Sequence, residues 1–372
     1  MVRFTGFEIL HLRLRLRSPF TTGYCSLREK DAVILRARTE DGHTGYGEAP
    51  VFGRPDYLPE SVDTVIPVLS RHILPPLVER ELGSVQELIS TYAWVAGNGA
   101  AKTAVEQAFL DVRSQMTGVP LHRLWDGRRR HIEAGTSIGS ATDLERTLHE
   151  IDAAIPYGYR RFKIKITPET AQSMLQAVRD RFAHVPLSAD ANGAYRVTDV
   201  DELVRLDRFG LLCIEQPLPP GDLLGHARVA GALSTPICLD ESVERAEDAA
   251  TIAHLRAASM VSIKPARAGG PSAALSLAAE CRSQGLETWC GGMLETGIGR
   301  ALCVHLSACE AFSLPAEISS TAQTFEQDVL KAPIEVADGR IDVPQSSGRG
   351  YEVDEDVLGR LVVGSTVVGR PG

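Results

Sequence analysis

Six charged residues recur through the middle of the chain at a nearly constant interval, and their types are those of acid–base chemistry. Three acids follow Lys165 at successive steps of 25 residues, and a lysine follows the last acid after 24. Another lysine, Lys163, precedes Lys165 by two positions. In order, the series is Lys163, Lys165, Asp190, Glu215, Asp240 and Lys264.

The three acids and the flanking lysines predict a metal-assisted proton abstraction. Carboxylates that meet in a low-dielectric site repel one another unless a cation joins them. Oxygen ligands favour Mg²⁺, or Mn²⁺ in its place, whereas zinc prefers His or Cys. Burial, a nearby metal and a second ammonium all lower the pKa of a lysine, which can then act as a general base near neutral pH. We expect removal of a weakly acidic proton next to a carboxylate, with the metal stabilising the resulting charge.

Two reactions could follow that proton removal. If Lys165 and Lys264 face each other across a site, one lysine can remove a proton and the other can return one to the opposite face, which is a 1,1-proton transfer. A single base acting with a leaving group would instead give β-elimination. The residues alone leave both reactions open.

The regular spacing indicates a repeating strand–helix unit that places these residues at strand ends. In "RFKIKI" apolar residues alternate with cations, so one strand face suits helices and the other carries Lys163 and Lys165 inward. Eight such segments predict an α/β fold, a (β/α)7β TIM-like barrel whose strand ends form the active site. The segments are "EAGTSIG" (133–139), "RFKIKI" (161–166), "VPLSAD" (185–190), "LLCIEQP" (211–217), "TPICLDES" (235–242), "SMVSIKP" (259–265), "LETWCGG" (286–292) and "FSLPAE" (312–317).

The residues before the barrel have a different pattern and predict a small α+β capping domain. Leucines alternate with arginines over 12–17, which is the periodicity of a strand and not of a targeting helix. Strand patterns extend to about residue 60, and helical spacing follows until Gly118 and Pro120 end it. We predict the capping domain at 1–130, completed by a C-terminal segment at about 325–372, and the barrel at 131–324.

Composition excludes two classes of partner. The net charge of -9 is spread along the chain without a basic run, which argues against nucleic acid. Apolar content of 44% without a stretch near ~20 apolar residues argues against a membrane span. The seven cysteines form no CxxC motif, so we expect a reducing, cytoplasmic setting.

An ordered set of motifs resembles a known enzyme family along nearly the whole chain. The sequence is similar to the muconate lactonizing enzyme subgroup of the enolase superfamily, and most similar to its o-succinylbenzoate synthase and N-succinylamino acid (N-acylamino acid) racemase family. The resemblance implies a small-molecule carboxylate substrate and a homo-oligomer. The motifs are "SPFTTGY" (18–24), "YGEAP" (46–50), "KIK" (163–165), "DAN" (190–192), "IEQP" (214–217), "LDES" (239–242), "IKPARAGG" (263–270) and "CGGMLETGIGRA" (290–301).

The resemblance also implies residue roles. Lys165 and Lys264 are the two acid/base lysines, and Lys163 adjusts Lys165 and touches the substrate carboxylate. Arginine at position 267 accompanies racemase activity in this family. Capping loops at Pro19–Tyr24 and Val51–Tyr57 set specificity. The implied metal ligands are Asp190, Glu215 and Asp240, and the implied substrate-binding residues are Asn192, Ser137, Arg267, Gly292, Met293, Phe20 and Tyr57.

Several alternatives remain beside N-acylamino acid racemisation. An o-succinylbenzoate synthase needs the same residues. A dipeptide epimerase is disfavoured because "LPAEISSTA" lacks the Asp-x-Asp pair that this resemblance expects, and a sugar-acid dehydratase because "VSIKP" has lysine in place of a histidine base. A binding protein on an inactive barrel would have lost a ligand or a lysine. Cys213 and Cys238 are expected in the barrel core, and strand alternation predicts that Glu241 points away from Asp240.

Overall fold

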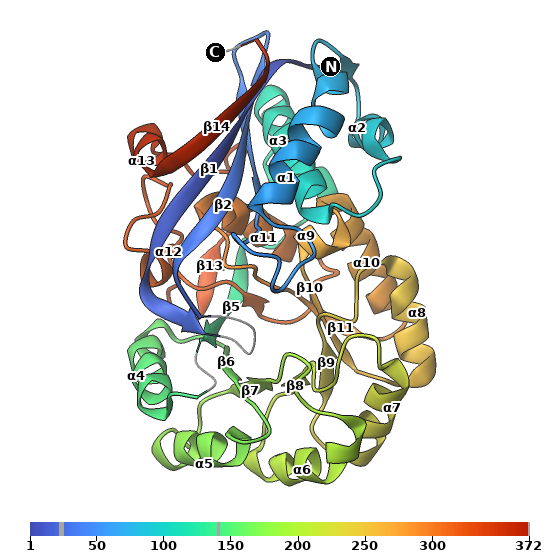
Figure 1. Cartoon of the computed structure of the whole chain (residues 1–372), viewed down its shortest axis with the longest axis vertical. Helices are drawn as coiled ribbons and strands as arrows, with labels where there is room; N and C mark the ends of the chain where they lie inside the picture. Colours follow the sequence, from blue (N-terminus) through green and yellow to red (C-terminus); the bar gives the residue numbers. More distant parts are fainter. Residues whose placement is uncertain (22–25, 140–141, 371–372) are drawn as a thin grey trace.

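The computed structural model describes residues 1–21, 26–139 and 142–370, and it has two parts. Figure 1 shows an antiparallel sheet with helices at the top of the molecule and a ring of strands and helices below it. Two long strands, β1 (Val2–Thr21) and β2 (Ser26–Thr39), run from the top of the cap down to the barrel (Figure 1). The cap therefore lies over the strand ends where the predicted chemistry is placed.

The cap sheet follows the expected alternation of buried and exposed residues. Leu12 and Leu14 are fully buried in β1, whereas the arginines between and after them are exposed. This confirms that the arginine-rich start is a strand. The strand order is β14-β1-β2-β3, with β4 on β1, and the remaining strands are β3 (Thr44–Ala49), β4 (Glu81–Leu82) and β14 (Val362–Gly369).

Three helices pack on the cap sheet. The longest, α3, ends where Gly118 adopts a left-handed conformation at φ +69, as the sequence predicts. Its buried alanines allow close contact, since a Cβ at Gly47 of β3 would lie 1.9 Å from the Ala104 carbonyl oxygen. The helices are α1 (Val62–Val68), α2 (Val85–Tyr92) and α3 (Gly99–Thr117).

Eight parallel strands form a nearly closed barrel, which confirms the predicted fold. Their order is β11-β10-β9-β8-β7-β6-β5-β12, and β13 (Arg340–Asp342) adds antiparallel to β5. Each predicted strand segment overlaps an observed strand. The strands are β5 (His131–Ile138), β6 (Arg161–Lys165), β7 (Leu187–Asp190), β8 (Ile214–Glu215), β9 (Ile237–Leu239), β10 (Met260–Ile263), β11 (Glu287–Cys290) and β12 (Ala316–Glu317).

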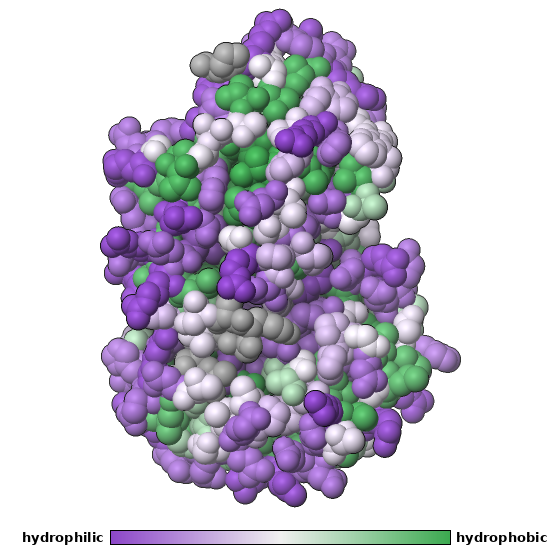
Figure 2. All heavy atoms as spheres, in the orientation of Figure 1, coloured by the Kyte–Doolittle hydropathy of each residue, from purple (hydrophilic) through white to green (hydrophobic). Residues whose placement is uncertain are grey.

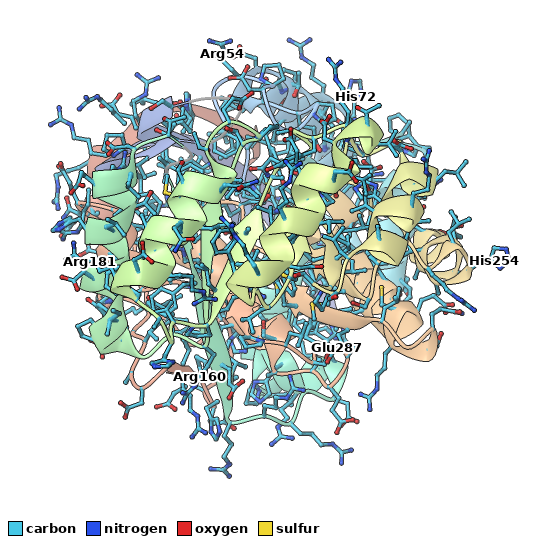
Figure 3. All side chains as sticks on the ribbon, turned by 90° about the horizontal axis from the view of Figure 1, so that it is seen from below. Arg54, His72, Arg160, Arg181, His254 and Glu287 are labelled. Carbon is cyan, nitrogen blue, oxygen red and sulfur yellow. The ribbon has the colours of Figure 1, made fainter. Side chains whose placement is uncertain are left out.

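Helices alternate with the barrel strands and cover them from outside. They bury apolar faces against the strands. On the face drawn in Figure 2, polar side chains surround several apolar patches. In the view from below, the labelled Arg181 and His254 lie at opposite edges of the molecule (Figure 3). The helices of this part are α4 (Leu144–Ala154), α5 (Ala171–Arg181), α6 (Val200–Val204), α7 (Leu223–Ala232), α8 (Ala246–Leu255), α9 (Pro265–Ala268), α10 (Pro271–Ser283), α11 (Gly297–Ser307) and α12 (Thr321–Thr324). The last helix, α13 (Glu355–Leu361), packs against β1 of the cap instead (Figure 1).

Two buried glutamates of the cap fasten it to the barrel. Glu48 of β3 accepts hydrogen bonds from the N–H of Thr296 at 3.1 Å and of Gly299 at 2.9 Å, where α11 begins. Glu106 of α3 accepts from the N–H of Ser272 at 2.8 Å, where α10 begins. Helix N-termini favour such carboxylates, which here cross from one part of the molecule to the other.

None of the helices within the described ranges is long and apolar enough to cross a membrane. The cysteines at 213 and 238 lie buried with Trp289 inside the barrel, as expected for core residues. Cys25 lies outside the described residues.

A stacked pair of histidines lies buried between the cap and the barrel. The rings of His122 and His305 are 5.5 Å apart at 11°, and both residues are inaccessible to solvent. His305 Nε2 donates to the Arg349 carbonyl oxygen at 2.9 Å, and Nδ1 has no partner. Burial lowers the pKa of His305 to about 4, so this imidazole is neutral in the folded protein at neutral pH.

This burial predicts a loss of stability in mild acid. Because the unfolded chain binds a proton near pH 6.5 and the folded His305 only near 4, stability falls as pH drops below about 6.5. Between pH 7 and 5 we expect His305 to contribute about 2 kcal/mol to this loss. Urea unfolding of His305→Gln at both pH values should show a decline smaller by that amount. The exposed His254→Gln should decline like the parent, and an equal decline in both variants would contradict the assignment.

Candidate active site

A cavity of about 810 Å³ lies at the carboxyl ends of the barrel strands, beneath the cap. The barrel contributes polar side chains to its wall, including both predicted acid/base lysines, Lys165 and Lys264. The cap contributes aromatic ones, Phe20, Phe52 and Tyr57. The position agrees with the active-site end of this class of barrel.

Lys163 lies among three carboxylates. Its Nζ is 3.2 Å from Asp190 Oδ2, 3.0 Å from Glu215 Oε1 and 2.8 Å from Glu317 Oε1. Its side chain is 2% exposed, so water screens these ion pairs little. The inward direction predicted from strand alternation is confirmed.

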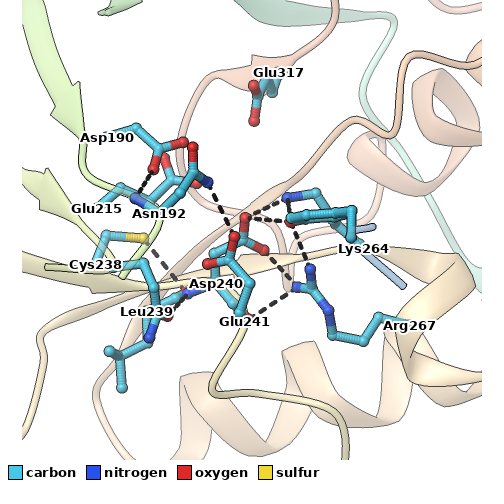
Figure 4. A network of polar contacts seen from close by, with 12 residues as sticks. Asp190, Asn192, Glu215, Cys238, Leu239, Asp240, Glu241, Lys264, Arg267 and Glu317 are labelled. Carbon is cyan, nitrogen blue, oxygen red and sulfur yellow. Dashed lines mark hydrogen bonds and ion pairs between the residues drawn. The ribbon is translucent and has the colours of Figure 1, made fainter. Parts of the chain in front are cut away.

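Lys165 lies two residues beyond Lys163 on the same face of β6, closer to the mouth of the barrel. Its Nζ donates to Asp190 Oδ2 at 2.6 Å and to Asn192 Oδ1 at 2.8 Å. The Asn192 amide in turn donates to Glu241 Oε1 at 3.0 Å (Figure 4). Strand alternation predicts that Glu241 points away from Asp240, yet its carboxylate joins the polar network of the site. Strand β9 ends at Leu239, so strand alternation no longer determines where Glu241 points.

Lys264 belongs to a second cluster, centred on Asp240 (Figure 4). Lys264 Nζ is hydrogen-bonded to Asp240 Oδ2 and donates to the Tyr57 hydroxyl at 3.0 Å. Arg267 donates to Asp240 Oδ1 at 2.5 Å and to the Tyr57 hydroxyl at 2.6 Å. Tyr57 donates to Asp240 Oδ2 at 3.2 Å, so a cap residue touches three site residues at once.

Burial and ion pairing act against each other on the pKa values of these groups. Burial alone would raise the pKa of Asp240, but the Lys264 ammonium and Arg267 guanidinium outweigh it and hold that pKa well below its usual range. Burial raises the pKa of Glu215 to about 8, with only Lys163 opposing it strongly. For Lys264, burial is the largest single effect and lowers the pKa, but the attraction of Asp240, together with that of Glu317, leaves the pKa raised. The sequence predicts a lowered lysine pKa in a site that contains a metal. The contacts of Lys264 with the protein alone have the opposite effect on its pKa.

The donor set at the strand ends fits a hard divalent cation. Asp190 and Glu215 pair in register on adjacent strands, and Asp240 follows the next strand. All three are at most 1% exposed, and Glu215 Oε2 is buried without a hydrogen-bond partner. In this structure the three carboxylates are paired with lysines. Among the described residues, no group of three His, Cys, Asp or Glu side chains is arranged to bind one ion. The oxygen-only chemistry and the unpaired Glu215 oxygen nevertheless suit Mg²⁺.

The other predicted substrate-binding residues line the same cavity. Ser137, Gly292, Met293 and Phe20 are all in its wall, and Ser137 Oγ is buried without a partner. Phe20 lies near the end of β1, close enough that a Cβ at Gly139 would be 2.6 Å from its ring. Of the predicted capping loop at Pro19–Tyr24, the part from residue 22 onward lies outside the described residues.

Two residues in the site were missed from the sequence. Glu317 ends β12 and holds Lys163, yet its strand lacks the 25-residue spacing of the others. Gln216 follows Glu215 with a left-handed φ of +41, uncommon for a residue other than glycine. Its side-chain oxygen accepts from the Asp240 N–H at 2.9 Å, and its amide donates to the Ser242 hydroxyl at 2.7 Å. Gln216 thereby ties the end of β8 to the end of β9.

Comparison with known proteins agrees with this arrangement. Residues 5–125 match the family model "Mandelate racemase / muconate lactonizing enzyme, N-terminal domain", and residues 146–357 match "Enolase C-terminal domain-like". A barrel with a capping domain and charged strand ends is the architecture of the enolase superfamily, to which this chain belongs.

Comparison with individual proteins identifies the family within this superfamily. An o-succinylbenzoate synthase from Geobacillus stearothermophilus is 38% identical over 344 residues, 92% of each chain. An N-succinylamino acid racemase from Thermus thermophilus is 37% identical over 362 residues, 97% of this chain and 98% of the relative. A crystal structure of an enolase superfamily member from Listeria innocua matches with a TM-score of 0.92 and 34% identity, covering 99% of this chain and 100% of that one. The chain is an enzyme of the o-succinylbenzoate synthase and N-succinylamino acid racemase family, of isomerase or lyase type.

The position of Gln216 yields a test of how the strand ends are held. Gln216→Gly and Gln216→Ala both remove the buried hydrogen bonds, which we expect to lower the free energy of unfolding by about 2 kcal/mol. Alanine should lower it by about 1 kcal/mol more, because only glycine tolerates the positive φ without strain. Urea unfolding measures both values. Equal stability of the two variants would mean that the backbone relaxes to an ordinary conformation.

Proposed function

We propose that this enzyme racemises N-succinyl- or other N-acylamino acids by a two-lysine 1,1-proton transfer. The observation that carries the proposal is the placement of Lys165 and Lys264 in the wall of one cavity. They come from β6 and β10, which are four strands apart in an eight-stranded barrel, so they stand on opposite sides of its mouth. A substrate carbon between them would have one lysine on each face.

The residues around each lysine define its part in this reaction. Lys165 is oriented by Asp190 and Asn192, and Lys264 by Asp240 and Tyr57. One lysine would remove the proton from the carbon next to the substrate carboxylate, and the other would donate a proton from the opposite face. Asp190, Glu215 and Asp240 would hold Mg²⁺, which when bound supplies electrostatic stabilisation of the developing negative charge.

Arg267 supports racemisation over elimination. The family resemblance associates arginine at this position with racemase activity, and here the guanidinium is bound to Asp240 and Tyr57, both partners of Lys264. We infer that it acts on Lys264 through these two groups. The second candidate is o-succinylbenzoate synthase, because similar proteins of that name are 38% identical to this chain. The synthase would use the same lysines with a leaving hydroxyl on the substrate.

A dipeptide epimerase remains disfavoured for a geometric reason. Glu317 lies at the end of the last strand, where a carboxylate could hold a substrate amino group, but both of its oxygens are within 2.9 Å of Lys163 Nζ. A carboxylate already paired with a lysine has little attraction left for a second ammonium.

Substitution of each lysine tests the two-base reaction stereospecifically. Lys165→Ala and Lys264→Ala should each reduce racemisation of an N-succinylamino acid at least about 100-fold. Each variant should still exchange the α-proton of one enantiomer in D₂O, and the two variants should exchange opposite enantiomers, because each retains the base on one face. Proton NMR with polarimetry follows both events.

The exposed Lys331→Ala is the matched control and should behave like the parent. Racemisation that survives either active-site substitution would exclude the two-lysine reaction. Dehydration of the cyclohexadiene precursor to o-succinylbenzoate, without exchange of any N-acylamino acid, would favour the synthase.

Removal of divalent cations gives a further test. Dialysis against EDTA should abolish α-proton exchange, and added Mg²⁺ or Mn²⁺ should restore it, because the proposed cation stabilises the negative charge that develops next to the substrate carboxylate. Zn²⁺ should restore less, since all three proposed ligands are oxygens. Full exchange in EDTA, with metal absence verified by elemental analysis, would contradict the metal assignment.

A further inference from the structure

Glu317 contacts Lys163 from the opposite side to the other two acids. Along the sheet, Asp190 and Glu215 come from β7 and β8 on one side of β6, and Glu317 comes from β12 on the other, beyond β5. Its two oxygens are 2.8 and 2.9 Å from Lys163 Nζ, closer than either of the other acids. Glu317 is therefore the nearest of the three carboxylates to this ammonium.

The surroundings hold Glu317 in this position. Its side chain is 11% exposed, and its backbone pairs in register with Gly135 of β5. Gly292 packs against it, because a Cβ there would lie 2.9 Å from the Glu317 carbonyl oxygen. In Figure 4 the Glu317 carboxylate lies apart from Asp240 and Arg267 and points toward the cluster of acids.

The other two partners of Lys163 are proposed metal ligands, and this creates a competition. An ammonium shared by Asp190 and Glu215 occupies oxygens that a divalent cation would need, and it would repel that cation at short distance. A third carboxylate on the far side of Lys163 resolves the conflict, because the ammonium keeps a counter-charge when the first two acids turn away from it.

We propose that Glu317 is a positioning residue that draws the Lys163 ammonium toward β12 and so leaves Asp190 and Glu215 available to the cation. The inference rests on the proposed function, since it assumes those two acids bind a metal. It assigns Glu317 an effect on cation affinity that it exerts through Lys163 and not by touching the metal.

Cation binding without substrate tests the proposal. By titration calorimetry, Glu317→Gln should raise the Kd for Mg²⁺ about tenfold or more, because Lys163 then has only the metal ligands as counter-ions. Glu317→Asp keeps the charge with a shorter reach and should raise the Kd less. Glu335→Gln removes an exposed glutamate and should leave the Kd unchanged. If Glu317→Gln does not fold, judged by its thermal unfolding, the comparison of Glu317→Asp with the parent decides.

A double-mutant cycle separates positioning from simple charge. In a Lys163→Met background, Glu317→Gln should change the Kd by less than about threefold, since the residue it acts through is gone. An equally large loss in both backgrounds would show that Glu317 attracts the cation by its charge alone and would overturn the proposal. An unchanged Kd in the single variant would overturn it as well, while parent binding of Mg²⁺ would still support the proposed function. If the parent protein binds no Mg²⁺, the result would contradict both this proposal and the metal-dependent reaction proposed above.

Discussion

The burial of opposite charges in one small volume is the constraint on which the site depends. Four cations and five carboxylates meet at the barrel mouth, which leaves one excess negative charge. Such charges are costly to bury unless each is paired. Burial raises the pKa of Glu215 to about 8 against the opposing effect of Lys163, so the charged form of this carboxylate is disfavoured. A divalent cation bound together with a substrate carboxylate would remove the excess negative charge.

The cap contributes to this balance and does not merely cover it. Tyr57 contacts Lys264, Arg267 and Asp240, so the cap supplies part of the hydrogen bonding that orients the proposed acid/base lysine Lys264. Thr103 of α3 donates to the Pro265 carbonyl oxygen at 3.2 Å, directly after Lys264. Docking of the cap is therefore a condition for the geometry of the lysine on β10, and the buried Glu48 and Glu106 contacts maintain that docking.

Periodic features of the site could be predicted from sequence, and non-periodic ones could not. The 25-residue step and strand alternation placed Lys163 and Lys165 inward and the acids at successive strand ends, because a repeating barrel unit imposes both patterns. Glu317 was not predicted as a site residue because it follows Lys264 by 53 residues, and β11 between them does not end in a charged residue that would continue the spacing. The contact of Tyr57 with Asp240 spans 183 residues and depends on how the cap docks, which no local pattern encodes.

The connection between cap and barrel links substrate specificity to the chemical step. The cavity is walled by Phe20, Phe52 and Tyr57 of the cap and by the lysines of the barrel, so a substrate bound at the proposed lysines would lie next to cap side chains. Because the Tyr57 hydroxyl accepts a hydrogen bond from Lys264, a change in the capping segment that shifts Tyr57 would also disturb the position of this proposed base. Catalysis is sensitive to displacements of about 1 Å. Capping segments in such a protein can therefore change which substrates react and how fast without any substitution in the barrel.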